Sequence, residues 1–175
     1  MDEIMTERLI LRPFRESDCD DLCEFLYQLK DDEFEGYPDL DAETARAQLM
    51  ERIGSGEYYA VTLRESGKVI GSICCADRAQ QAKEVGYIIN EDYRRRGYAL
   101  EALTAVVRAA FRAGVHRICA ECDPRNERSW RLPEAAGFRR EAHLRQNVYF
   151  HTDAAGEPIW KDTYVYAMLR GDVKM

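Results

Sequence analysis

The sequence has no long apolar run and no recognisable targeting segment. Its 175 residues contain no stretch that approaches the ~18 consecutive apolar residues of a membrane-spanning helix. The first residues, MDEIMTERL, are acidic and lack the basic and apolar regions of a signal peptide. We therefore expect a cytoplasmic protein that has no membrane partner.

Histidine is scarce, with three residues, and the six cysteines show no metal-binding or disulfide spacing. Cys119 and Cys122 form one Cys-x-x-Cys motif inside an expected strand, where positions three apart point to opposite faces. A structural zinc site needs four converging ligands, and the sequence offers no second such motif. We therefore expect free thiols and no metal.

Basic residues are fewer than acidic ones, 25 against 32, which gives a net charge of −7. This balance argues against general nucleic-acid binding, for which a basic surface is typical. It fits a basic amine as substrate. The basic residues gather instead in two short segments, which contain Arg94, Arg95, Arg96, Arg125, Arg128 and Arg131.

The chain is long enough for one domain, 1–175, with a sizeable core, and 46% of its residues are apolar. The patterns predict strands at 9–11, 58–63, 68–76, 85–89, 115–122, 138–148 and 159–169. They predict helices at 17–29, 41–53, 100–111 and 126–137, with Ser17, Asp41 and Asn126 as the caps of the first, second and fourth. This arrangement indicates an α/β (α+β) fold, a mixed sheet of about seven strands flanked by helices.

One segment, 84–111, combines a strand, a short loop and a helix. The strand is β-branched or aromatic apart from Gly86, and turn-forming residues end it at 90–92. The helix that follows carries its apolar residues on one face. The first N–H groups of a helix have no helical partner and bind anions, and the small Gly97 and Ala99 leave room for one. The turn therefore suits a pyrophosphate, and a basic surface loop is the alternative.

Three motifs together resemble the GNAT acetyltransferase superfamily. The pattern Arg94-x-x-Gly97-x-Ala99 is similar to the acyl-CoA pyrophosphate loop of that family. The segments NERS at 126–129 and EAAGF at 134–138 resemble its Asn-x-x-Ser…Glu-x-x-Gly-Phe region. The segment TERLILR at 6–12 resembles the first strand of the branch that acetylates ribosomal-protein N-termini, polyamines and similar amines. The resemblance covers nearly the whole chain and implies the GNAT fold.

The resemblance also implies acetyl-CoA as co-substrate and places it. In the family, the backbone of the central strand holds the pantetheine arm, and the turn after it holds the pyrophosphate. The implied cofactor-binding residues are Tyr87, Ile88, Ile89, Arg94, Arg95, Arg96, Gly97, Tyr98, Ala99, Leu100, Asn126 and Ser129. A plain core strand is the alternative for 87–89, and the two are compatible because backbone groups do the binding.

The resemblance implies direct attack of a primary amine on the thioester in a ternary complex, which needs a base. Glu84 is the first candidate, because several family members carry a glutamate where the central strand opens. A carboxylate there takes the amine proton if partial burial raises its pKa. Glu33, Glu35 and Asp162 are the other candidates, and a solvated Glu84 is the alternative.

The leaving thiolate needs a proton, which a tyrosine usually gives in this family. Pro133 stands at the position where that tyrosine is expected, so the chain departs from the family pattern. Ser129, one turn earlier, is the candidate catalytic donor, and hydrogen bonding at the helix start is its alternative role. Pro133 also removes a helical hydrogen bond, so we expect this helix to be short or kinked.

The acidic loop 30–40 lies where the family lines the acceptor side of its cleft. We expect Glu33, Glu35 and Tyr37 to bind the acceptor, while acids that merely face water are the alternative. A protein N-terminus, a polyamine, an aminoglycoside and a small amino acid all fit. Two other functions stay open, a CoA-binding module without catalysis and a ribosome- or RNA-associated phosphate-binding protein. A homodimer also stays open.

Overall fold

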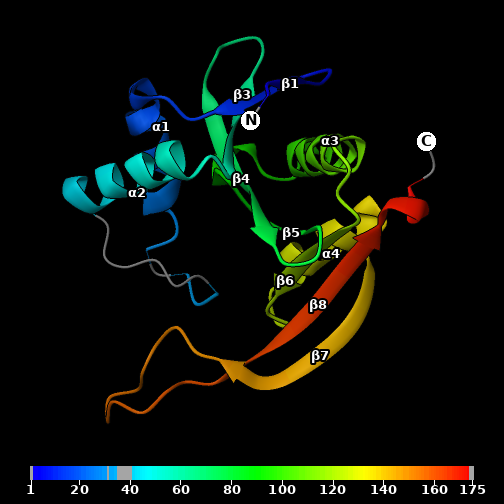
Figure 1. Cartoon of the computed structure of the whole chain (residues 1–175). Coiled ribbons are helices and arrows are strands. Elements are labelled where there is room, and N and C mark those ends of the chain that lie inside the picture. The colour runs from blue at the N-terminus through cyan, green and yellow to red at the C-terminus, as the bar shows by residue number, and fades with distance from the viewer. Residues whose placement is uncertain (1, 31, 35–40, 174–175) are drawn as a thin grey trace.

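The computed structural model describes residues 2–30, 32–34 and 41–173 (Figure 1). Eight described strands form one mixed sheet in the order β1-β2-β3-β4-β5-β6-β8-β7. Their bounds are β1 Ile4–Met5, β2 Leu9–Pro13, β3 Tyr58–Leu63, β4 Val69–Arg78, β5 Ala82–Ile89, β6 Arg117–Cys122, β7 Arg139–Val148 and β8 Lys161–Leu169. The predicted mixed sheet is confirmed, with one strand more than expected, because the two-residue β1 pairs with β2.

Four α-helices cover the two faces of this sheet, namely α1 Cys19–Tyr27, α2 Ala42–Ser55, α3 Tyr98–Arg112 and α4 Glu127–Ala136. Short 3₁₀ turns lie at Glu16–Asp18, Glu91–Tyr93 and Arg170–Asp172. Among the described residues, no helix is both long enough and apolar enough to cross a membrane.

The protein has two apolar cores, one on each face of the sheet, because neighbouring residues of a strand point to opposite faces. On one face, α1 and α2 bury Leu22, Phe25 and Leu49 against Ala60 and Val69. On the other face, α3 packs its apolar stripe against the alternate residues of the same strands, including Ile73 and Val85. Covering both faces explains why 69–76 reads as an almost continuous apolar run.

A side-chain cap marks the start of α2, and a buried ion pair marks the start of α1. Asp41 caps α2 as predicted, since its carboxylate accepts a 2.8 Å hydrogen bond from the Thr44 N–H. For α1 the prediction of Ser17 is wrong, because Asp18 occupies the N-cap position. The Asp18 carboxylate is buried and binds both terminal nitrogens of Arg12, each at 2.8 Å. That ion pair fixes the entry to the helix.

Strands β5 and β6 are the parallel pair of the sheet, and they separate in the middle of the molecule. They pair only from Ala82 to Glu84, opposite Arg117 to Cys119. Beyond that point β4 still holds β5 as far as Ile89, while β8 holds β6. The backbone of β5 after Glu84 therefore has no strand partner on its β6 side among the described residues. A gap opens in the centre of the sheet.

Candidate functional site

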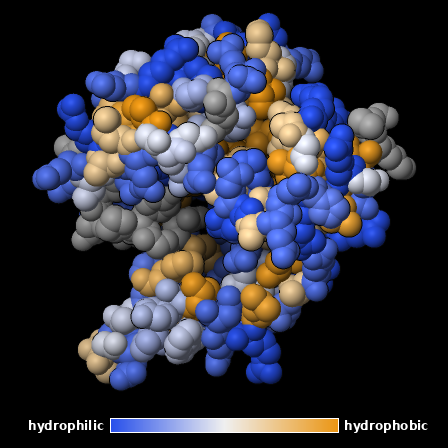
Figure 2. Space-filling view, viewed as in Figure 1, coloured by the Kyte–Doolittle hydropathy of each residue, from blue (hydrophilic) through white to orange (hydrophobic). Residues whose placement is uncertain are grey.

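Two cavities meet at the gap between β5 and β6. The first, which we call the turn cavity, has a volume of about 370 Å³ and lies beside the turn from β5 into α3. The second, the sheet cavity, has a volume of about 460 Å³ and is lined from β4, β5, β6 and α2. Both are lined by Tyr87, Ile88 and Ser129. Ligands bound in the two cavities would therefore both be bordered by those three residues. Figure 2 shows that the surface of the molecule is hollowed above the β7–β8 hairpin.

The turn cavity brings together most of the residues predicted to bind the cofactor. Its wall includes Tyr87, Ile88, Ile89, Arg94, Arg95, Gly97, Tyr98, Ala99, Leu100, Asn126 and Ser129. Arg96 differs, because its guanidinium lies over the Tyr93 ring and its carbonyl accepts a hydrogen bond from Arg8. Arg128 and Arg131 add two further cations to the wall. The wall thus combines a helix start with several positive charges, which suits an anion.

Backbone conformation shapes this turn. Gly97 is the N-cap of α3 with a φ of +82°, a region that side chains with a Cβ rarely adopt. Arg95 also has a positive φ, of +59°. Alternation of left-handed residues with their neighbours makes a concave row of N–H groups that binds anions. The glycine in the predicted motif therefore has a conformational reason as well as a steric one.

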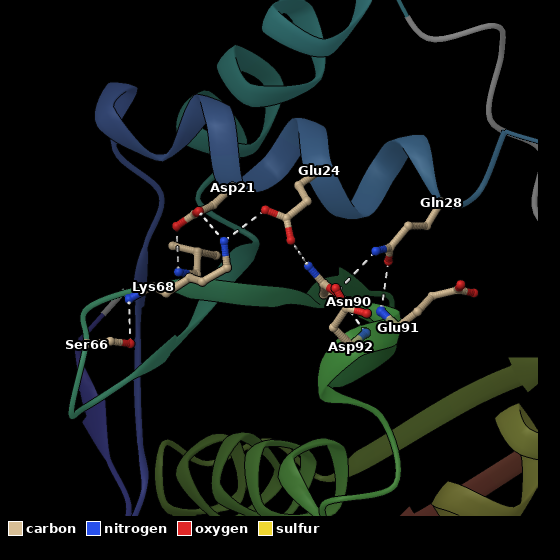
Figure 3. Close-up of polar contacts among 9 residues, drawn as sticks. Asp21, Glu24, Gln28, Ser66, Lys68, Asn90, Glu91 and Asp92 are labelled. Atoms are coloured by element: carbon tan, nitrogen blue, oxygen red, sulfur yellow. Dashed lines mark hydrogen bonds and ion pairs between the residues drawn. The ribbon is translucent and has the colours of Figure 1, made fainter.

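A buried asparagine anchors the end of β5 where the turn begins (Figure 3). The Asn90 side chain is fully buried and donates to Glu24 at 2.7 Å. Its amide oxygen accepts from Gln28 and from the Asp92 N–H, and Gln28 in turn accepts from the Glu91 N–H. Helix α1 thereby fixes the strand end and the start of the turn.

We predict that Asn90→Ala lowers the free energy of unfolding by about 2–4 kcal/mol, because it leaves buried polar groups without their partners. Chemical denaturation measures the loss. Ser66→Ala is the control from the same region, since the Ser66 hydroxyl accepts only an exposed 3.4 Å hydrogen bond from the Lys68 N–H. It should change stability by less than about 0.5 kcal/mol. Equal effects of the two substitutions would contradict an anchoring role for Asn90.

Helix α4 presents Ser129 to both cavities. The Asn126 side chain caps the helix by accepting from the Ser129 N–H at 3.2 Å, as its motif predicts. The Ser129 hydroxyl donates to Cys122 Sγ at 3.4 Å. The helix continues through Pro133 to Ala136 and is ten residues long, which agrees with the short helix predicted over 126–137.

Pro133 has no N–H to donate to the carbonyl of Ser129, four residues earlier. The Tyr87 hydroxyl replaces that donor and binds the Ser129 carbonyl at 2.7 Å. Burial, the largest cause, raises the pKa of Tyr87 far above its ordinary value, so the hydroxyl remains protonated. Sequence reasoning used only the backbone of Tyr87 and missed this contact between the central strand and α4.

Three glutamates, Glu57, Glu84 and Glu121, line the sheet cavity together with Arg52 and Arg78. Glu84 lines it and is held by Arg78, whose Nη2 lies 2.9 Å from Glu84 Oε2. Glu121 lies on β6, two residues beyond Cys119, the register partner of Glu84. Partial burial raises the pKa of Glu121, the charge of Glu84 raises it further, and Arg78 opposes the shift. Sequence reasoning missed Glu121, because its approach to Glu84 depends on the register of β5 and β6.

The other residues predicted to bind the acceptor or to act as base lie elsewhere or outside the described residues. Glu35 and Tyr37 belong to the second group. The Glu33 carboxylate pairs with Arg125 at 3.2 Å, and its carbonyl accepts from Lys161. Asp162 binds His143 at 2.7 Å on the β7–β8 hairpin. In the part of the chain that the structure describes, neither Glu33 nor Asp162 lines the two cavities.

Comparison with known proteins gives consistent matches along the chain. A protein-family model described as an acetyltransferase (GNAT) domain matches residues 8–139. An uncharacterised N-acetyltransferase of Bacillus subtilis is 29% identical, over 95% of this chain and 96% of the relative. The [ribosomal protein uS5]-alanine N-acetyltransferase of Escherichia coli is 25% identical, over 97% of this chain and 91% of the relative.

Solved structures of acetyltransferases share the fold. The crystal structure of a GNAT-family acetyltransferase from Bacillus anthracis has a TM-score of 0.87 and 27% identity, and covers 97% of this chain and 99% of its own. A ribosomal L7/L12 alpha-N-protein acetyltransferase in complex with coenzyme A has a TM-score of 0.80 at 20% identity, covering 96% of this chain and 98% of its own. The second likeness concerns the fold alone.

Proposed function

Because the chain belongs to the GNAT family of acetyltransferases, we propose that it moves the acetyl group of acetyl-CoA to a primary amine by direct attack in a ternary complex. The family makes the protein an acyltransferase. The observation that carries the finer proposal is the meeting of the turn cavity and the sheet cavity at Tyr87, Ile88 and Ser129. An acyl donor in one cavity and an amine in the other come into contact there, so that transfer needs no carrier.

Acetyl-CoA fits the turn cavity from its pyrophosphate to its thioester. The start of α3, with Arg94, Arg95 and Gly97 in the wall, suits the pyrophosphate. The pantetheine arm then lies along the unpaired edge of β5, which brings the thioester to Ile88 and Ser129. A coenzyme A-bound acetyltransferase with the same fold supports this cofactor class. Acetyl-CoA is the co-substrate in this proposal.

The amine enters through the sheet cavity, where Glu121 is the proposed general base and Glu84 is its neighbouring carboxylate. Glu84 is ion-paired with Arg78. Burial is the largest cause that raises the pKa of Glu121, and the charge of Glu84 raises that pKa further. Glu121 therefore takes up a proton more readily than an ordinary glutamate does, which suits a general base. The two carboxylates also attract an ammonium group, so a cationic amine is the acceptor class that this cavity favours. In the described part of loop 30–40, Glu33 is proposed to contact the part of the acceptor that extends beyond the sheet cavity.

The amine attacks the thioester directly in this proposal, and Cys74, Cys75 and Cys119 are poor nucleophiles for a covalent route. Burial raises the pKa of Cys74 and Cys119, and it raises the pKa of Cys75 to about 11. A covalent route would need a thiolate, whose population falls as the pKa rises. Ser129, which lines both cavities, gives its hydroxyl proton to the leaving thiolate, for which the hydroxyl turns away from Cys122 Sγ.

We expect Ser129→Ala to lower kcat by about three- to tenfold without changing the affinity for acetyl-CoA, because water partly replaces a lost hydroxyl donor. Steady-state kinetics with the best acceptor gives kcat, and calorimetry with CoA gives the affinity. Ser129→Thr keeps the hydroxyl and serves as the control. A kcat of Ser129→Ala equal to that of the wild type would assign the thiolate proton to solvent.

The proposed function is tested by measuring CoA thiol release from acetyl-CoA over a panel of a polyamine, an aminoglycoside, a small amino acid and peptides with a free N-terminus. We expect release that depends on one class of amine and saturates with it. Release at the same slow rate with and without every amine would contradict the proposal.

A further inference from the structure

The N-terminal segment TERL, residues 6–9, has no part in the function described so far, yet the structure places it against the start of α3. Helix α3 packs against β1 and β2, between which this segment lies (Figure 1). The Thr6 hydroxyl donates to Glu101 Oε1 at 2.6 Å, and the Arg8 backbone N–H donates to the same oxygen at 2.9 Å. Two separate donors of one short segment thus converge on one helix carboxylate.

The Arg8 side chain reaches further, into the turn itself. Its Nε donates to Glu101 Oε2 at 2.7 Å, and its Nη1 donates to the Arg96 carbonyl at 2.9 Å. The guanidinium also lies over the Tyr98 ring, 4.5 Å from its centroid. These contacts use several N–H groups and the flat face of the guanidinium at the same time. The single ammonium group of a lysine cannot make all of them together. Arg8 therefore joins the helix, the turn and an aromatic ring at one point.

The bond to the Arg96 carbonyl fixes the direction of the next N–H. In a planar trans peptide the C=O and N–H point in opposite directions. Because the Arg96 carbonyl points to Arg8, the Gly97 N–H points away from Arg8. Gly97 lines both the turn cavity and the hollow beside Arg8, so the side away from Arg8 is the turn cavity. No described residue accepts a hydrogen bond from this N–H.

This peptide needs such a restraint because of its neighbours. Arg95 and Gly97 both have positive φ, so Arg96, whose carbonyl belongs to this peptide, lies between two left-handed residues. Glycine adopts either sign of φ readily, so this peptide is not held by local preference alone. The hydrogen bond from Arg8 to the Arg96 carbonyl selects the orientation in which the Gly97 N–H faces the turn cavity.

Glu101 keeps the guanidinium in place. Burial alone would raise the pKa of the Glu101 carboxyl, but the hydrogen bonds from Thr6 and Arg8 outweigh burial and lower it. The carboxylate is therefore ionised over the ordinary pH range, and its place in the first turn of α3 is favourable to negative charge.

We infer that Arg8 is a positioning residue for pyrophosphate binding, which holds the Gly97 N–H toward the turn cavity through the Arg96 carbonyl. The inference rests on the proposed function, because it takes acetyl-CoA as the ligand of that cavity. Arg8 itself touches the outer side of the turn and not the ligand. Its contribution is preorganisation, which raises affinity by reducing the cost of ordering on binding.

The test compares CoA binding by the wild type and by Arg8→Gln in calorimetry. We expect Arg8→Gln to weaken CoA about tenfold, the loss typical of one charge-assisted hydrogen bond. Turnover of acetyl-pantetheine, which lacks the pyrophosphate, should stay unchanged. The matched control is Arg64→Gln, because Arg64 holds the same segment through the carbonyls of Thr6 and Glu7 and does not contact the turn. It should bind CoA as the wild type does.

Each other result is decisive. Wild-type affinity in Arg8→Gln, or equal weakening in Arg8→Gln and Arg64→Gln, would overturn the positioning role and leave the proposed function standing. A wild-type protein that does not bind CoA would overturn both. If Arg8→Gln does not fold, Arg8→Lys decides, since it keeps the charge but cannot span Glu101 and the Arg96 carbonyl together. Weaker CoA binding with normal acetyl-pantetheine turnover supports the inference, and unchanged CoA binding refutes it.

Discussion

Replacement of Gly97 by valine is expected to weaken CoA binding by at least about a hundredfold while the protein stays folded. Gly97 has a φ of +82°, which a β-branched residue can hardly adopt, and a Cβ there would lie 3.3 Å from Arg8 Nη2. The turn must therefore change its conformation and lose the row of N–H groups that faces the cavity. Gly97 lies outside both apolar cores, so the fold should survive. Calorimetry with CoA and a thermal melt measure the two effects.

Gly156→Val is the matched control for this experiment. Gly156 has nearly the same φ, +84°, and lies between β7 and β8 with no atom near its missing Cβ. It should lose a similar amount of stability and keep the CoA affinity of the wild type. Unchanged CoA affinity in Gly97→Val would remove the main support for acetyl-CoA in the turn cavity.

The second large effect is expected from Glu121→Gln, which should lower kcat by about a hundredfold or more with little change in CoA affinity. The ionised carboxylate is the form that accepts the amine proton. Because the pKa of Glu121 is raised, its acidic limb in the pH–rate profile should lie above the ordinary range of a glutamate. Activity then rises as the pH rises through that pKa. The limb should disappear in Glu121→Gln.

Glu84→Gln separates the two carboxylates. Removal of the Glu84 charge takes away one of the causes that raise the pKa of Glu121, so the acidic limb should shift to lower pH. We expect a smaller loss of kcat than in Glu121→Gln, and less than additive losses when both are changed. A hundredfold loss in Glu84→Gln with full activity in Glu121→Gln would make Glu84 the base. Full activity of both variants would place the base outside this pair.

The sequence was sufficient to predict the parts of the site that depend on local chemistry. The turn around Gly97 and the cap at Asn126 were predicted because each follows from neighbouring residues. The hairpin between β4 and β5 is tighter than the predicted strands 68–76 and 85–89 implied. It turns at Gln80 and Gln81, which adopt positive φ without being glycine or asparagine. Nothing in those two side chains indicates such a turn.

Contacts between distant segments were beyond sequence reasoning. Glu121 meets Glu84 only through the register of β5 and β6, which no local pattern fixes. Arg8 and Glu101 are 93 residues apart, and their pairing depends on how α3 lies on the sheet. The Tyr87 hydroxyl compensates for Pro133 in the same way, by a contact between a strand and a helix. Patterns along one chain predict elements well, while partners between elements require the packed fold.

The most direct test of the account is a single-turnover reaction with acetyl-CoA labelled in its acetyl group, quenched at intervals and analysed by mass spectrometry. The account predicts that the label passes from acetyl-CoA to the nitrogen of the acceptor amine, with CoA released at the same rate and no labelled protein at any time. Labelled protein that forms and decays at the rate of turnover would contradict direct attack between the two cavities. Absence of any labelled amine across the acceptor panel would contradict the proposed acetyl transfer itself.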